Sequence, residues 1–164
     1  MVNWILWAFV GAAVIHVVEE FGYPGGFLET MRRFSPRFAP SVTTRLAVIV
    51  NGLFLLLCVA GAIVGDRSPF LGLSIASLLL FNSLMHIGGS IKARGYAPGL
   101  ASGILLYLPL SLYAVYLLIA SGRLTLTEGI AAGLLGALYQ AVPLGCLALS
   151  ATQQRLRMKR ETRY

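Results

Sequence analysis

Residues 4–20 read WILWAFVGAAVIHVVEE, an apolar run that ends in one imidazole and two carboxylates. Continued to residue 23, the run matches the roughly 20 residues that a helix needs to cross the hydrocarbon core of a bilayer. Ionisable side chains inside such a helix are energetically costly and commonly functional. This stretch therefore predicts both a membrane-spanning helix and a site on that helix.

Four further apolar runs follow the first. The five runs comprise residues 4–23, 46–64, 70–91, 100–120 and 129–150. Of the 164 residues, 57% are hydrophobic and 12% are charged, and this charged fraction is about half that of a soluble domain. We therefore expect an all-α, polytopic membrane protein. Residues 1–150 form a single transmembrane domain of five helices, and residues 151–164 form a basic cytoplasmic tail.

The basic residues set the expected orientation. With five helices, all but Arg67 and Arg123 of the thirteen lysines and arginines fall on one side. Those on the richer side are Arg32, Arg33, Arg37, Arg45, Lys92, Arg94, Arg155, Arg157, Lys159, Arg160 and Arg163. The positive-inside rule then places the N-terminus outside the cell membrane and the C-terminus in the cytoplasm. We attribute the basic tail to this orientation and to anionic lipid head groups, and we expect no nucleic-acid partner.

A second pattern follows the first run. In FLETMRRFSPRF, residues 27–38, four apolar side chains recur at spacings of four, three and four: Phe27, Met31, Phe34 and Phe38. Arginines occupy other positions around the same helical wheel. This pattern is typical of a short amphipathic helix that lies in the membrane interface. We expect Pro36 to break it, and a lid over a site below is the functional alternative.

The polar residues inside the predicted spans are few and lie at similar depths. With the orientation above, the titratable and amide side chains all fall in the cytoplasmic half: His16, Glu19, Glu20, Asn51, Asn82, His86 and Gln140. One helical turn separates His16 from the two glutamates, and one turn separates Asn82 from His86, so each group shares a helix face. If the first three helices pack together, two imidazoles, two carboxylates and two amides meet in one pocket.

Other interpretations of these residues stay open. Glu20 can be solvated at the interface, and Asn51 and Asn82 can serve only as hydrogen-bonding groups between helices. Tyr96 either roofs the pocket or anchors at the interface. For Gln140, a role in the site and a purely structural role are equally open.

With these residues identified, the chain resembles the HXXEE-domain family of small membrane proteins. The motif that names the family is present as HVVEE, and the later stretch NSLMHIGGSIKARGYAPG has the family's order of residues. That stretch supplies Asn82, His86, Tyr96, Pro98 and Gly99, and an apolar helix with Pro109 follows. The resemblance extends from the first helix through the fourth. It strengthens the choice of site residues and leaves the reaction open, since the family carries no settled activity.

The first functional hypothesis is a membrane-embedded, metal-dependent enzyme. His16, His86 and Glu19 or Glu20 supply two imidazoles and a carboxylate, a set that suits iron or zinc. The other glutamate can bridge a second metal or act as a general base. Asn51 and Asn82 can orient the ligands, so we expect catalytic roles for Glu19, Glu20, Asn51 and Asn82. The expected substrate is a lipid or another apolar molecule from the bilayer.

Alternatives use the same residues. A metal-free lipid isomerase or cyclase would use a buried glutamate as the acid, and a small transporter would use the carboxylates as ion sites. A haem between the two histidines and a purely structural role are further alternatives. Two histidines are too few for a desaturase-type diiron site. The Gly61 and Gly65 pair has the GxxxG spacing and is compatible with a homodimer.

Overall fold

In the part of the chain that the structure describes, the protein is all-α: helices are joined by turns, and there are no strands. The computed structural model describes residues 3–34 and 36–161, without the side chains of 37, 38, 144, 146, 147, 150, 151 and 153–161. The helices are α1 (Asn3–Phe21), α2 (Phe27–Phe34), η1 (Pro36–Ser41), α3 (Thr44–Val64), η2 (Gly65–Arg67), α4 (Pro69–Ala93), α5 (Leu100–Ser102), the π-helical turn η3 (Gly103–Tyr107), α6 (Leu108–Ala120) and α7 (Leu126–Glu161).

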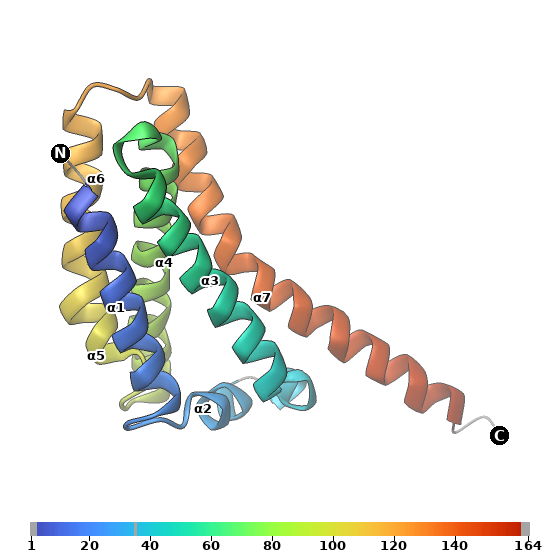
Figure 1. Ribbon diagram of the computed structural model, residues 1–164. Helices are drawn as coiled ribbons and strands as arrows, with labels where there is room; N and C mark the ends of the chain where they lie inside the picture. The colour runs from blue at the N-terminus through green and yellow to red at the C-terminus, as the bar shows by residue number, and fades with distance from the viewer. Residues whose placement is uncertain (1–2, 35, 162–164) are drawn as a thin grey trace.

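Helix α4 lies at the centre of the bundle. Every residue from Gly72 to Leu79 is buried, and a helix that is buried all round must be covered by others on each side. Figure 1 shows α1 and α6 on one side of α4, with α3 and α7 on the other. Both α3 and α7 diverge from α4 toward the end of the bundle where α2 lies. The long helices are therefore packed more closely at one end than at the other.

Local sequence explains where α4 and α3 begin. Ser68 caps α4 by accepting a hydrogen bond from the backbone N–H of Leu71 (3.2 Å), with Pro69 in the first turn. Thr43 caps α3 in the same way through the N–H of Leu46 (3.2 Å). Such caps satisfy N–H groups that have no partner within the helix.

Small residues allow the close packing of α4. A Cβ on Gly136 of α7 would lie 2.5 Å from the carbonyl oxygen of Ser74 and 2.7 Å from the backbone nitrogen of Leu78. A Cβ on Gly61 of α3 would overlap Ile75, and one on Gly65 would overlap Asn3. Both glycines of the GxxxG pair therefore serve contacts within the chain, and the homodimer stays a prediction.

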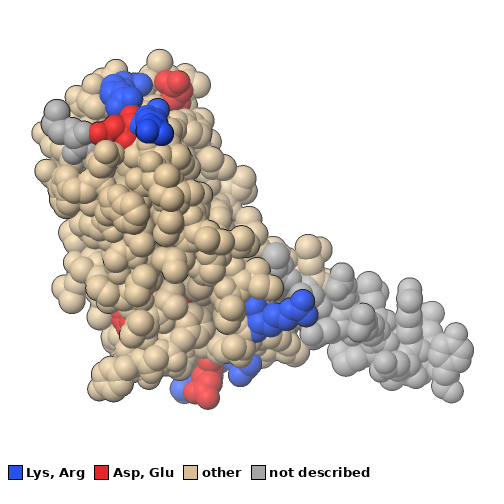
Figure 2. Space-filling model, in the orientation of Figure 1, with Lys and Arg blue, Asp and Glu red and all other residues tan. Residues whose placement is uncertain are grey.

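Among the described residues, four helices are long and apolar enough to cross a membrane: Asn3–Phe21, Thr44–Arg67, Pro69–Ala93 and Leu100–Ala120. On the face shown in Figure 2, the described Lys, Arg, Asp and Glu side chains gather at the two ends, and the belt between them is almost free of charge. The fifth predicted run lies in α7, which continues to Glu161 across the predicted boundary at residues 150 and 151. Residues 162–164 of the predicted tail, and most of its side chains, lie outside the described residues.

The predicted helix after the first span is present. It forms α2, which ends at Phe34, and η1 follows from Pro36. Arg32 ties α2 to the start of α3, because its guanidinium donates from Nη2 (2.8 Å) and Nε (3.2 Å) to the carbonyl of Val42. The side chain of Phe38, the last member of the predicted apolar face, lies outside the described residues. The location of α2 in a membrane interface stays a prediction.

Candidate functional site

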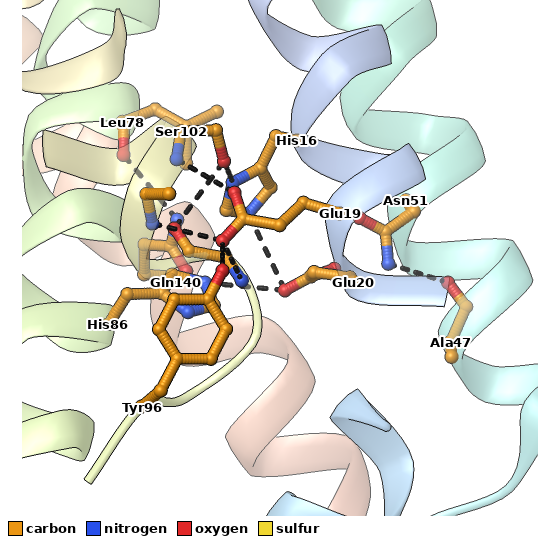
Figure 3. Close-up of polar contacts among 12 residues, drawn as sticks. His16, Glu19, Glu20, Ala47, Asn51, Leu78, His86, Tyr96, Ser102 and Gln140 are labelled. Atoms are coloured by element: carbon orange, nitrogen blue, oxygen red, sulfur yellow. Dashed lines mark hydrogen bonds and ion pairs between the residues drawn. The ribbon is translucent and has the colours of Figure 1, made fainter. Parts of the chain in front are cut away.

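The site lies where α1 meets α4 and the turn before α5. The buried face of α1 recurs every three or four residues through Ile5, Phe9 and Ala12 and then continues into His16, Glu19 and Glu20. The same periodicity that buries the apolar residues therefore also buries the polar ones. Helix α4 contributes His86, and Figure 3 shows how these side chains converge.

Glu20 lies between the two imidazoles. Its Oε1 atom is 3.4 Å from Nε2 of His16 and 3.3 Å from Nε2 of His86. The two rings meet edge to face with their centroids 4.8 Å apart. One ligand atom from each of the three residues lies within 4.8 Å of the others. His16 is 1% exposed, Glu20 3% and His86 9%, so this cluster is almost completely shielded.

The ring of His16 is held on two further sides. Its Nδ1 atom lies 2.7 Å from the hydroxyl oxygen of Ser102, and the Tyr107 ring packs against it with centroids 4.5 Å apart. If the Ser102 hydroxyl accepts from Nδ1–H, the Nε2 lone pair faces Glu20. If the hydroxyl donates to Nδ1, Nε2–H donates to Glu20. The tautomer of His16 and the orientation of the Ser102 hydroxyl are therefore coupled.

Glu19 has a different environment from Glu20. Its Oε1 atom accepts hydrogen bonds from the backbone N–H groups of Gly99 (3.0 Å) and Ala101 (2.9 Å) and from the Tyr96 hydroxyl. Its Oε2 atom accepts from the N–H of Ser102 (2.7 Å). These backbone donors belong to the start of the α5–η3–α6 helical stretch, and a helix N-terminus favours an anion. Glu19 thus anchors α1 to this stretch.

Tyr96 takes part in this anchor. Burial of its hydroxyl and the hydrogen bond to the Glu19 carboxylate raise the pKa of Tyr96 to about 12. The phenol therefore stays protonated at neutral pH and remains a donor. Tyr96 thus contacts a site residue while 51% exposed, and the choice between roofing the pocket and anchoring at the interface stays a prediction.

Gly99 allows the turn to approach the two imidazoles. Its φ is +93°, a conformation that favours glycine, and a Cβ there would overlap the His86 ring and lie 2.8 Å from Cε1 of His16. The YAPG segment thus has a steric reason for its glycine. Without it, the backbone donors of this turn could not reach Glu19 while His86 reaches Glu20.

An apolar cavity of about 170 Å³ opens onto the cluster. Glu20 and His86 line it together with side chains of α2 and α3, among them Met31, Phe34 and Leu46. Glu19 does not line this cavity. It borders a separate hollow on the other side of α1, together with Tyr23, Tyr96 and Leu105.

The three predicted amides all line the cavity. Nδ2 of Asn51 donates to the carbonyl of Ala47 in its own helix (3.1 Å), and Nε2 of Gln140 approaches the carbonyl of Leu78 (3.4 Å). The Oδ1 atom of Asn82 is buried without a hydrogen-bond partner. The structure therefore brings these amides near His86 and Glu20, and the catalytic roles expected of Asn51 and Asn82 stay predictions.

Ser102 was not anticipated from the sequence. A single serine after an apolar turn gives no sequence signal of a role in the site, and only the tertiary fold brings Ser102 to His16. Tyr107 ends the π-helical turn η3, and such turns are frequent at functional sites.

A family model described as "Protein of unknown function with HXXEE motif" matches residues 7–114. The chain belongs to this HXXEE family. The matched part of this HXXEE protein includes His16, Glu19, Glu20 and His86 as well as Ser102 and Tyr107, and it ends before α7. No curated protein and no solved structure matches the chain.

Proposed function

We propose that this HXXEE protein is a membrane-embedded, metal-dependent enzyme that acts on a lipid or another apolar substrate. His16, Glu20 and His86 hold the metal, and the substrate occupies the adjoining cavity. The observation that carries the proposal is the convergence of two imidazoles and one carboxylate from α1 and α4, two of which, Glu20 and His86, line an apolar cavity. Two histidines with one carboxylate are a known ligand set of iron and zinc enzymes.

The distances between Glu20 and the two imidazoles are long for charge-assisted hydrogen bonds and are compatible with a cation. Charge-assisted N–H to carboxylate hydrogen bonds are usually about 2.7–2.9 Å long, whereas Glu20 Oε1 lies 3.3 and 3.4 Å from the two Nε2 atoms. With metal–ligand bonds of about 2.0–2.1 Å, neighbouring ligand atoms of a tetrahedral site lie roughly 3.3 Å apart. Two of the three ligand separations are close to this value, and all three lie within 4.8 Å.

The surroundings also suit a catalytic metal. Three protein ligands leave a coordination position for substrate or water. Ser102 can accept from Nδ1–H of His16 and so present the Nε2 lone pair to the metal. Bound zinc supplies Lewis acidity, and bound iron supplies redox chemistry.

The chain's own residues have separate tasks in this proposal. Glu20 and the two histidines bind the metal, while Glu19 holds the α5 turn against α1 and is a positioning residue. Asn82 and Gln140 face the substrate. Helix α2 covers the cavity and excludes water from it.

The membrane arrangement completes the proposal. Helix α7 forms a fifth span, and α2 lies in the cytoplasmic interface of the cell membrane with its arginines toward lipid phosphates. The N-terminus is outside and the C-terminus is cytoplasmic. The cavity then opens in the cytoplasmic half of the bilayer, where an apolar substrate can enter.

A metal-free acid–base enzyme is the second candidate. The same positions of His16 and His86 allow two neutral imidazoles to donate their Nε2–H groups to Glu20, which needs no metal. Such a site could shuttle a proton to an apolar substrate in the cavity. Metal content separates the two candidates.

The test is elemental analysis of the protein after purification without chelators, beside His86→Ala and Ser83→Ala. Ser83 lies on the same helix and is fully buried, but its hydroxyl bonds to its own helix at the Leu80 carbonyl (2.8 Å). We expect about one iron or zinc per wild-type and Ser83→Ala chain and almost none in His86→Ala. Absence of any transition metal from the wild-type protein would favour the metal-free candidate.

A further inference from the structure

The cavity next to Glu20 has both polar and apolar walls. Glu20 of α1 and Asn82 and His86 of α4 line it, and so do Phe27, Met31 and Phe34 of α2. A molecule that fills this cavity must therefore have one polar group and an apolar body.

The amide oxygen of Asn82 indicates which hydrogen-bonding group the bound molecule carries. Its Oδ1 atom is buried and accepts no hydrogen bond from the described residues, and buried acceptors are rarely left without a donor. The other two amides of the cavity already contact backbone carbonyls. A molecule in the cavity that carries a donor could satisfy this oxygen.

We propose that the cavity binds a single-chain lipid alcohol, whose hydroxyl donates its proton to Oδ1 of Asn82. This inference rests on the proposed function and adds its substrate class. The lone pairs of the hydroxyl oxygen turn toward the cation held by His16, Glu20 and His86. The hydrocarbon chain lies against Phe27, Met31 and Phe34.

Other head groups satisfy only part of this environment. An ionised carboxylate has no proton for Asn82. An ammonium group donates protons but is repelled by the bound cation. An ether has lone pairs and no donor. Of these four groups, only a hydroxyl both donates and accepts, so it matches Asn82 and the cation together.

The size of the cavity favours a flexible chain. An apolar cavity of about 150 Å³ binds a benzene ring, so the 170 Å³ here hold about six carbon atoms. The rest of a long chain must pass out beside α2, none of whose residues is fully buried. A single alkyl or isoprenoid chain can follow this path.

The test is photo-crosslinking in native membranes with three probes of equal length. The probes are a long-chain alcohol with a diazirine in the part of its chain that lies against α2, the methyl ether of that alcohol, and the corresponding carboxylic acid. Labelled peptides are identified by mass spectrometry in the wild-type protein, Asn82→Leu and Ser83→Ala. Ser83→Ala is the matched control, because Ser83 neighbours Asn82 on α4 but does not line the cavity.

We expect the alcohol to label peptides of α2 and α3 at least five-fold more than the ether or the acid in the wild-type protein and Ser83→Ala. In Asn82→Leu the alcohol should label no more than the ether. Equal labelling by the alcohol and the ether in the wild-type protein would by itself overturn the inference. An alcohol preference that survives in folded Asn82→Leu would overturn it as well.

Metal content measured in the same membranes separates this inference from the proposed function. Bound metal without an alcohol preference overturns the substrate class and leaves the metal site standing. An alcohol preference that depends on Asn82, in a protein without metal, supports the binding of the alcohol and removes the metal from the proposal.

Discussion

Oε1 of Glu20 lies 3.3 Å from Nε2 of His86, which joins α1 to α4 beside the cavity. The neighbouring residue Glu19 points to a different partner, the turn before α5, where it accepts four hydrogen bonds. Two adjacent carboxylates thus have two tasks. This division leads to predictions that separate binding of the metal from stability of the fold.

Glu19→Ala should destabilise the protein. The substitution leaves the N–H groups of Gly99, Ala101 and Ser102 without their acceptor, and hydrogen bonds to a charged group contribute about 1.5–3 kcal/mol each. Because water can replace part of the loss at the exposed Ala101, we expect a decrease of about 2–4 kcal/mol in the free energy of unfolding. Denaturant unfolding in detergent measures it. A variant as stable as the wild-type protein would contradict the anchoring role.

Ser102→Ala should weaken metal binding and leave the fold intact. The substitution removes the partner of Nδ1 of His16, and loss of such an outer partner commonly lowers metal affinity about 10- to 100-fold. Competition with a chelator of known affinity measures the change. Unchanged affinity would mean that the tautomer of His16 is set by something other than Ser102.

Gly99→Ala should destabilise the protein strongly. Its φ of +93° is unfavourable for alanine, and the new Cβ would overlap the His86 ring. We expect a loss of at least about 2 kcal/mol in the free energy of unfolding. Gly52→Ala is the matched control, because a Cβ at Gly52 meets nothing within 4 Å. That helical change should be neutral or stabilising by up to about 1 kcal/mol, and equal effects of the two substitutions would contradict the steric argument.

The proposed five-span arrangement predicts a labelling pattern in intact cells. In a variant without Cys58 and Cys146, a membrane-impermeant maleimide should label Ser121→Cys and fail to label Gly95→Cys or Thr152→Cys until the cells are opened. Ser121 and Gly95 lie at opposite ends of α6 and its preceding turns, and Thr152 lies on α7. Labelling of Thr152→Cys from outside would contradict a crossing by α7.

Much of the site could be predicted from the sequence because helical spacing fixes which residues share a face. The separation of His16 and Glu20 by four residues, and the turn between Asn82 and His86, placed these side chains correctly. The same reasoning could not distinguish Glu19 from Glu20, since residues at i+3 and i+4 both lie near residue i. Contacts with Gly99 and Ser102, about eighty positions away, make the distinction.

The fold was predicted less completely, for similar reasons. The apolar runs marked the four helices that meet the length and apolarity of a span, and Pro36 marked the end of α2. The extension of α7 to Glu161 was not expected, because a polar, basic sequence can continue a helix without any apolar pattern. The role of Ser102 depends wholly on tertiary contacts.

The most direct test of the metal site compares the two adjacent glutamates. Metal per chain should be measured in the wild-type protein, Glu20→Gln and Glu19→Gln, all purified without chelator and confirmed to be folded. We predict about one iron or zinc in the wild-type protein and in Glu19→Gln, and loss of at least nine tenths of it in Glu20→Gln. Metal retained in Glu20→Gln and lost in Glu19→Gln would contradict the assignment of Glu20 as the ligand.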